Sequence, residues 1–411
     1  MITIAKFLKD WETKNAKNVT KTGSFSMMAL SLAACGGGGG GGVSTPTPIV
    51  GATPVFEPVT SDLTIWNDIV VGTTGADTVT GLRIDTVQTF NSGDSIALGD
   101  GIDNLSATLN EGTVTPAAIT GVENVMFVAL GPATIDFDNV SGVTSLISRG
   151  SSATLVVDDI QEIPTSISVN NNTAAQTFIF KDTAVSGNTD ELTLQFDGVG
   201  GVVNVGSELD GDGDIEIFTI IAADGASDLG VGNGFGADAK TITVHATSDL
   251  DLGSTAQFIA STYFDASDST AAVTAVFAAK TTASETSVTI KGGAGADKFD
   301  IGTFTAEENF GDLIVDMGDG NDTLDLGAVA DTDTGSSIKG GSGDGDILII
   351  SGSALTAEVS SQISEFEILN IETTGLTQDA DNFGGTIFGT AAAIAEMRID
   401  NLAGGSIINI N

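Results

Sequence analysis

A glycine-aspartate motif that recurs five times constrains the fold of this 411-residue chain more than any other feature. Residues 292–300 (GGAGADKFD) match the pattern G-G-x-G-x-D-x-U-x, in which U is apolar, at every fixed position. Each of the other four copies departs from the pattern at one place. Internal repetition predicts an architecture in which each structural unit packs on its neighbours. The other copies are residues 72–80, 98–106, 317–325 and 340–348.

Each position of the motif has a physical role. Glycines permit positive φ angles and let carbonyl oxygens converge without obstruction by side chains. The aspartate adds an anionic oxygen, and calcium takes hard oxygen ligands at about 2.3–2.6 Å. The apolar residue two places later is expected to point inward from a strand. We therefore predict calcium ligands at Gly75, Asp77, Gly99, Asp100, Gly101, Asp103, Gly292, Gly293, Gly295, Asp297, Asp300, Gly318, Asp319, Gly320, Asp322, Asp325, Gly341, Gly343, Asp344 and Asp346.

The spacing of the copies predicts how they stack. The copies that begin at residues 292, 317 and 340 lie 25 and 23 residues apart, and those at 72 and 98 lie 26 apart. This spacing favours one turn per large solenoid coil, with Asp297, Asp322 and Asp346 in a column at one corner. The alternative is a set of isolated glycine turns in a β-sandwich.

The segments between the turns predict strands. Short β-branched runs such as residues 153–157, 192–196 and 287–290 are separated by Gly, Asp, Asn and Ser. The chain is 41% hydrophobic but only 6% aromatic, which favours a thin core of Val, Ile, Leu and Ala. Helical patterns occur at residues 355–363 and 391–397. We predict an all-β, repetitive β-solenoid of the β-roll or β-helix kind, with β-sandwich portions as the alternative. Its expected units are residues 61–180, 181–285 and 286–411.

The charge limits the choice of partner. The chain has 14 Lys and Arg against 55 Asp and Glu, for a formal net charge of −41. Such a surface repels nucleic-acid phosphates and anionic membranes, so we expect no nucleic-acid partner. It also opposes compaction unless cations neutralise it, and calcium fits oxygen-rich turns. A solvated acidic surface is the alternative explanation of the charge.

Residues suited to catalysis are scarce. Cysteine and histidine occur once each, as Cys35 and His245, so no disulfide can form within the chain. Catalysis by a Ser-His-acid or Cys-His set would need His245, which falls in the strand-like run 241–245. Acid pairs such as Asp158 and Asp159 are expected in turns, and few aromatic residues are available to stack sugars. We therefore expect no enzyme; a polysaccharide-active enzyme is the least favoured function.

The first sixty residues predict export. Residues 1–34 are basic and end in an apolar run, residues 25–34, which is too short to cross a bilayer. Residues 32–35 (LAAC) resemble a bacterial lipobox, which implies cleavage before Cys35 and its acylation. Residues 35–60 then form a Gly- and Pro-rich tether. The alternative is secretion that uses no N-terminal signal.

The nonapeptides resemble the calcium-binding RTX repeat, although in that family they run back to back and here they are isolated. Three further segments, residues 119–125, 214–218 and 363–371, echo one another. The whole succession, over roughly residues 65–375, resembles surface-layer and adhesin-like β-repeat proteins of Gram-negative, especially alphaproteobacterial, cells.

This resemblance implies a calcium-binding structural protein of the bacterial cell surface, either extracellular or an outer-membrane lipoprotein. Its partners would be copies of itself, other cell-surface components, and the membrane through a lipid on Cys35. The alternative function is a calcium-dependent adhesin or receptor-like binding module.

Overall fold

The computed structural model describes most of the chain that follows the predicted tether. All described residues belong to the second of two units, residues 56–411. Residues 1–56, which hold Cys35 and most of the tether, lie outside the described residues. The described ranges are 57–208, 215–229, 234, 239–253, 261–278, 287–304, 311–329, 335–350, 356–372, 377–379, 396–399 and 407–409.

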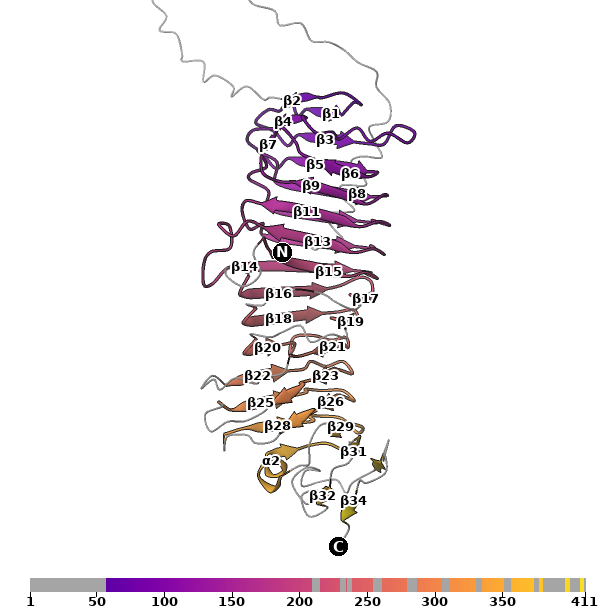
Figure 1. The fold of residues 1–411 in the computed structure, drawn as a ribbon, viewed down its shortest axis with the longest axis vertical. Helices are drawn as coiled ribbons and strands as arrows, with labels where there is room; N and C mark the ends of the chain where they lie inside the picture. The colour runs from indigo at the N-terminus through magenta and orange to yellow at the C-terminus, as the bar shows by residue number, and fades with distance from the viewer. Residues whose placement is uncertain are drawn as a thin grey trace, which may run out of the picture. The chain divides into compact units, whose positions relative to one another are not determined.

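One parallel sheet of 14 strands, called the long sheet below, runs through the described residues (Figure 1). Between β1 and β30, which end the sheet, each strand pairs with the strand of the coil before it and with that of the coil after it. Strands from all three expected units take part, so the pairing continues through residues 180 and 285. In order, the strands are β1 (Thr60–Asp62), β3 (Thr78–Gly81), β5 (Asn104–Leu109), β8 (Asn124–Ala129), β10 (Ser145–Arg149), β12 (Ser166–Asn170), β14 (Glu191–Asp197), β16 (Ile217–Ala222), β18 (Thr241–Ala246), β20 (Tyr263–Asp265), β22 (Val288–Lys291), β25 (Leu313–Asp316), β28 (Ser337–Lys339) and β30 (Ile363–Ser364).

Two further sheets hold the strands that follow those of the long sheet in each coil. The five-stranded sheet comprises β6 (Gly112–Val114), β9 (Ala133–Asp136), β11 (Leu155–Ile160), β13 (Gln176–Phe180) and β15 (Val203–Ser207). The eight-stranded sheet comprises β17 (Ser227–Asp228), β19 (Leu250–Asp251), β21 (Val273–Val276), β23 (Lys298–Asp300), β26 (Thr323–Asp325), β29 (Ile347–Ile350), β31 (Ile368–Ile371) and β33 (Glu396–Ile399).

Short strands complete some of the coils. A three-stranded sheet comprises β2 (Ile69–Val71), β4 (Ser95–Ala97) and β7 (Ala118–Thr120). Two strand pairs join β24 (Thr303–Phe304) to β27 (Ala328–Val329) and β32 (Thr377–Asp379) to β34 (Ile407–Asn409).

Every pairing between these strands is parallel, which confirms the predicted β-solenoid. Within the described residues no β-sandwich portion occurs, because a sandwich would need antiparallel sheets. The pairing of each coil with the next explains why a thin core suffices: each coil buries its apolar residues on its neighbours.

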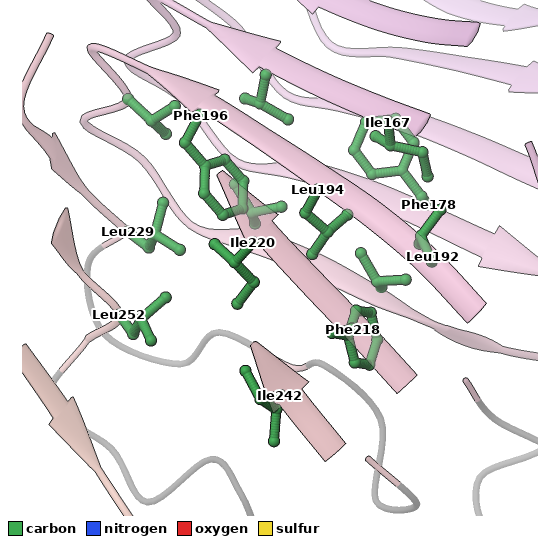
Figure 2. Packing of buried hydrophobic residues seen from close by; sticks show 14 of the residues in the cluster. Ile167, Phe178, Leu192, Leu194, Phe196, Phe218, Ile220, Leu229, Ile242 and Leu252 are labelled. Carbon is green, nitrogen blue, oxygen red and sulfur yellow. The ribbon is translucent and has the colours of Figure 1, made fainter. Parts of the chain in front are cut away.

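The core consists of apolar columns that follow the pairing register. In long-sheet strands such as β5, β8, β16 and β18, alternate residues point inward and are buried. Leu194 and Ile220 are register partners on β14 and β16, and their side chains lie side by side in one such column (Figure 2). Nearer the C-terminus, Phe264 makes edge-on contacts with Phe277 and Phe299, at ring-centroid distances of 5.1 and 5.5 Å. One column comprises Val79, Leu105, Val125, Leu146, Ile167, Leu194, Ile220 and Val244.

Helix is scarce, and one of the two expected helices is wrong in part. The helix expected over residues 355–363 is present as α2 (Ala357–Ser361), which Thr356 caps by accepting a hydrogen bond from the Val359 N–H. The second was expected to reach Met397, but Glu396–Ile399 is strand β33, paired with β31. The open edge of a strand offers hydrogen bonds that outweigh local helix propensity. Residues 391–395 lie outside the described residues.

Among the described residues, no helix has the length and hydropathy needed to cross a membrane.

Candidate functional site

Two columns of acidic side chains join successive coils, and we call them the acid ladders. The N-terminal ladder comprises Asp77, Asp103 and Glu123. The backbone N–H of Asp77 donates to Oδ1 of Asp103 at 2.6 Å, and the N–H of Asp103 donates to Oε2 of Glu123 at 2.8 Å. Val59 begins the column by donating its N–H to Oδ1 of Asp77 at 2.5 Å. Each carboxylate therefore accepts a backbone donor from the preceding coil.

The C-terminal ladder follows the same rule over one more coil. The N–H of Asp297 donates to Oδ1 of Asp322 at 2.7 Å, and the N–H of Asp322 donates to Oδ1 of Asp346 at 2.9 Å. Val273 begins the column by donating its N–H to Oδ1 of Asp297 at 2.8 Å. Glu367 ends it, accepting from the N–H of Asp346 at 3.0 Å. The predicted stacking of the three aspartates in one column is confirmed.

The two ladders occupy different corners of the solenoid. Asp77 and Asp103 lie directly before β3 and β5, which are strands of the long sheet. Asp297 and Asp322 lie directly before β23 and β26, which belong to the eight-stranded sheet. The motif alone could not distinguish these positions, because the same glycine turn can lead into either sheet.

Glutamates end the ladders, and their role was not predicted from the sequence. Glu123 and Glu367 stand in two of the segments that echo one another in the sequence. In the third segment, Glu216 accepts the N–H of Asp190 at 2.9 Å. This is the same kind of contact as in the ladders, but it joins only two coils. The similarity of the three segments could therefore have predicted these glutamates, because each segment places a carboxylate at a turn that lacks the glycine motif.

The aspartate that begins each ladder has both oxygens satisfied by the protein. Oδ2 of Asp77 accepts the N–H of Thr73 at 2.5 Å, and Oδ2 of Asp297 accepts the N–H of Gly293 at 2.6 Å. Their Oδ1 atoms accept from the preceding coil, as described above. These two predicted calcium ligands therefore have little remaining capacity for a metal.

The other three ladder aspartates each keep one oxygen without a partner. Asp103, Asp322 and Asp346 are 0% exposed, and their Oδ2 atoms are buried with no hydrogen-bond donor. A buried carboxylate oxygen without a partner is costly. These three oxygens are the strongest indication in the described residues that an external cation completes the turns.

Main-chain oxygens approach the same turns. A Cβ atom placed on Gly320, whose φ is +136°, would lie 2.2 Å from the carbonyl oxygen of Gly295 and 3.0 Å from Oδ1 of Asp322. A carbonyl of one coil and a carboxylate of the next thus lie beside the same glycine, at a position that no larger residue can occupy without displacing them. The same arrangement recurs at Gly101 with Gly75 and Asp103, and at Gly343 with Gly320 and Asp346. This donor set fits calcium, which accepts carbonyl and carboxylate oxygens together.

The remaining acidic residues that were predicted as calcium ligands lie away from these carbonyl and carboxylate oxygens. Asp100, Asp319 and Asp344 are exposed within their turns. Asp300 and Asp325 lie in register on neighbouring strands, at the opposite ends of β23 and β26 from the ladder. Each accepts a local N–H two residues later, from Gly302 or Gly327.

Burial raises the pKa values of four ladder aspartates, Asp103, Asp297, Asp322 and Asp346. It raises the pKa of Asp322 to about 8, against hydrogen bonding that lowers it, and Asp297 and Asp346 add like charge. Burial likewise raises the pKa of Asp297 and of Asp346 to about 6. The pKa of Asp103 is raised for the same reason. Without a cation, these carboxyls retain protons at pH values where ordinary aspartate has lost them.

A different acidic cluster lies midway along the solenoid. Asp136, Asp138 and Asp159 form the one group of three metal-ligand side chains found among the described residues. Lys181 occupies it, 2.9 Å from Asp138 and 2.8 Å from Asp159. Asp158 and Asp159 were expected in a turn, but they lie in β11 where its pairing with β13 is irregular. Here the protein supplies its own cation.

His245 is a half-exposed strand residue, as its sequence context indicated. It lies in β18, and its Nδ1 is 3.7 Å from Oδ2 of Asp268, a largely exposed carboxylate.

The glycine that borders the space beside Asp322 provides a direct test. Gly320→Ala is expected to lower the free energy of unfolding by about 1–3 kcal/mol, because it forces a side chain into a positive-φ position against a backbone oxygen. Gly345→Ala, one turn along, is the control, since its added Cβ would meet neighbours at 3.4 Å or more. Urea denaturation of both variants measures the difference; equal losses would contradict the geometry.

The chain matches no model of a known protein family, no curated protein and no solved structure.

Proposed function

We propose that the protein is a calcium-binding structural component of the bacterial cell surface that assembles with copies of itself. The observation that carries this proposal is the set of three buried carboxylate oxygens without partners, on aspartates that each lie beside a carbonyl oxygen of the preceding coil. Such a site serves stacking rather than chemistry, since its oxygens join coil to coil.

The residues that would hold calcium are few and repeated. Asp103, Asp322 and Asp346 would supply the carboxylates, with the carbonyls of Gly75, Gly295 and Gly320 from the preceding coils. Bound calcium would supply positive charge to carboxylates that form no ion pair within the described residues. This charge offsets the burial of the carboxylates and part of the net charge of −41.

Exposed apolar side chains at the N-terminal end of the solenoid support self-association. Trp66, Ile69 and Val71 are 74%, 82% and 71% exposed. Within the described residues, β1 pairs only with β3 and β2 only with β4, so this end presents strand edges as well (Figure 1). Strand edges and apolar side chains together favour a protein partner over lipid, because lipid cannot satisfy backbone groups. The other exposed apolar residues of these first coils are Ile65, Leu82, Ile84, Val87 and Ile102.

Changing the exposed end tests this association. Purified wild-type protein in calcium is expected to sediment as oligomers, and the double variant Ile69→Lys with Val71→Lys as a monomer. Leu130→Lys is the matched control, because Leu130 is also exposed (43%) but lies away from the end. Analytical ultracentrifugation makes the measurement. A wild type that remains monomeric across concentrations in calcium would count against the assembly function.

The proposed location follows from the N-terminal sequence. Cys35 would carry a lipid, and residues 36–60 would connect it to the solenoid. The acidic surface makes nucleic acid an unsuitable partner. The geometry of the described residues supplies no observation that favours an enzyme.

A further inference from the structure

Buried polar side chains also accept backbone N–H groups between coils outside the two ladders. In the coils of residues 124–272, which we call the central coils, buried Ser and Asn side chains accept backbone N–H groups of the preceding coil. Glu216 is a carboxylate that makes such a contact there, and Lys240 lies beside it. The N–H of Ala129 donates to Oγ of Ser151 at 3.0 Å, and the N–H of Ser151 donates to Oδ1 of Asn172 at 2.7 Å. These acceptors carry no charge, so burying them requires no cation.

The same contact recurs farther along the central coils. Oγ of Ser227 accepts the N–H of Val199 at 3.2 Å, and Oγ of Ser269 accepts the N–H of Ala246 at 3.0 Å. Both serines are buried, at 3% and 1% exposure. Neutral acceptors therefore join several of the central coils, and the carboxylate of Glu216, which joins another pair, has Lys240 at 3.8 Å.

Where the central coils do gather carboxylates, lysines accompany them. Besides Lys181 in its acidic cluster, Lys240 lies 3.8 Å from Glu216, and Asp265 has at 2.9 Å the ammonium of Lys291, which follows the central coils in the chain. Among the described residues, no such ion pair involves the ladder aspartates. Within that part of the chain, the protein thus supplies cations to the central coils and leaves the two ladders without them.

We infer that calcium orders the solenoid in two separate blocks at its ends, while the central coils are stable without it. The N-terminal block comprises residues 59–123 and depends on Asp103. The C-terminal block comprises residues 273–367 and depends on Asp322 and Asp346. The inference rests on the proposed calcium function and adds where calcium acts. The blocks respond independently because, in a solenoid, each coil contacts only its neighbours and the central coils separate the two ends.

Hydrogen exchange followed by mass spectrometry tests this in the full chain, dialysed free of metal and then given about 1 mM calcium chloride. Peptides from β3 to β5 and from β26 to β29 are expected to exchange about tenfold more slowly with calcium. Peptides from β11 to β13 are expected to be unchanged. Equal protection in all coils would overturn the two-block inference while leaving calcium binding intact. No change in any peptide would overturn both the inference and the proposed function.

Two variants are each expected to remove the calcium response of one block, so that the other block serves as the internal control. Asp103→Asn keeps an oxygen that can accept the N–H of Asp77 but removes the charge. It is expected to abolish the calcium response between β3 and β5 and to preserve it between β26 and β29. Asp322→Asn combined with Asp346→Asn is expected to do the reverse. A single variant that abolishes the response at both ends would show that the blocks are coupled and would overturn the inference.

Discussion

At a concentration tenfold above the dissociation constant, calcium is expected to raise the free energies of unfolding of the two blocks by about 4 kcal/mol in all. About 1.4 kcal/mol belongs to the N-terminal block and about 2.8 kcal/mol to the C-terminal block, since each of three sites contributes about 1.4 kcal/mol. The three sites are those of Asp103, Asp322 and Asp346, whose Oδ2 atoms lack partners. An increment of this size approaches the net stability of a small domain, about 5–15 kcal/mol. It would dominate the stability of the coils that contain it.

Thermal melts with and without a chelator, followed by circular dichroism, measure this effect. The metal-free protein should melt earlier, and its loss of β signal should be partial at first because the central coils do not depend on calcium. Magnesium is the control, since it demands a tighter octahedral site and should stabilise less. Identical melting curves in calcium and in chelator would contradict the calcium sites.

In the absence of calcium, stability is expected to fall as the pH rises from about 5 to about 8.5. Burial raises the pKa of Asp322 to about 8 and the pKa of Asp297 and Asp346 to about 6, above the ordinary value of 3.8. A carboxyl whose pKa is higher in the folded state favours folding while it is protonated. This contribution is complete below the unfolded pKa and is lost as the pH rises through the folded pKa.

A matched pair of variants separates the effect of the ladder carboxyls on stability from that of the overall charge repulsion. Protonation also relieves repulsion in a chain of net charge −41, so the wild-type slope alone is not diagnostic. Asp322→Asn should reduce the slope between about pH 6 and 8 by up to about 1.4 kcal/mol per pH unit. Asp319→Asn, which changes an exposed acid of the same turn, should leave the slope nearly unchanged. Urea denaturation of dialysed protein at each pH gives these values. A steeper slope in Asp322→Asn than in the wild type would refute the ladder's role.

Calcium should reverse this pH dependence. The metal binds the deprotonated carboxylate, so its affinity rises as Asp322 and Asp346 lose their protons. The stability that the metal-free protein loses at high pH should therefore be restored by calcium at that same pH.

The sequence determined the repeat and the strands because both depend on local pattern. Strand segments such as Leu192–Phe196 lie within β14, and the regular spacing of turns predicted stacked coils correctly. The same spacing also predicted the column of Asp297, Asp322 and Asp346, which the hydrogen bonds between coils confirm. Side-chain alternation and turn chemistry act over a few residues, so they can be recognised along the chain.

The hydrogen bonding of the acidic residues depends on the pairing between coils and could not be predicted from the motif. The motif predicted Asp297 and Asp322 equally as calcium ligands. In the structure the Gly293 N–H donates to Oδ2 of Asp297, whereas Oδ2 of Asp322 has no donor. The motif also missed Glu123 and Glu367, which complete the ladders without a glycine turn. Whether an oxygen has a donor depends on the coil stacked beside it, which is distant in the sequence.

Two properties of the glycine turns therefore have different causes: their recurrence comes from local sequence, and the hydrogen bonding of their carboxylates comes from the stacking of coils. The recurrence of five acidic turns, and the strands that follow them, could be predicted from the sequence alone. Which carboxylates lack a partner depends on the stacking of the coils, because hydrogen bonds between coils join residues that no local pattern relates. Three turns, at Asp103, Asp322 and Asp346, combine a carbonyl from one coil with a carboxylate from the next that keeps an unpartnered oxygen.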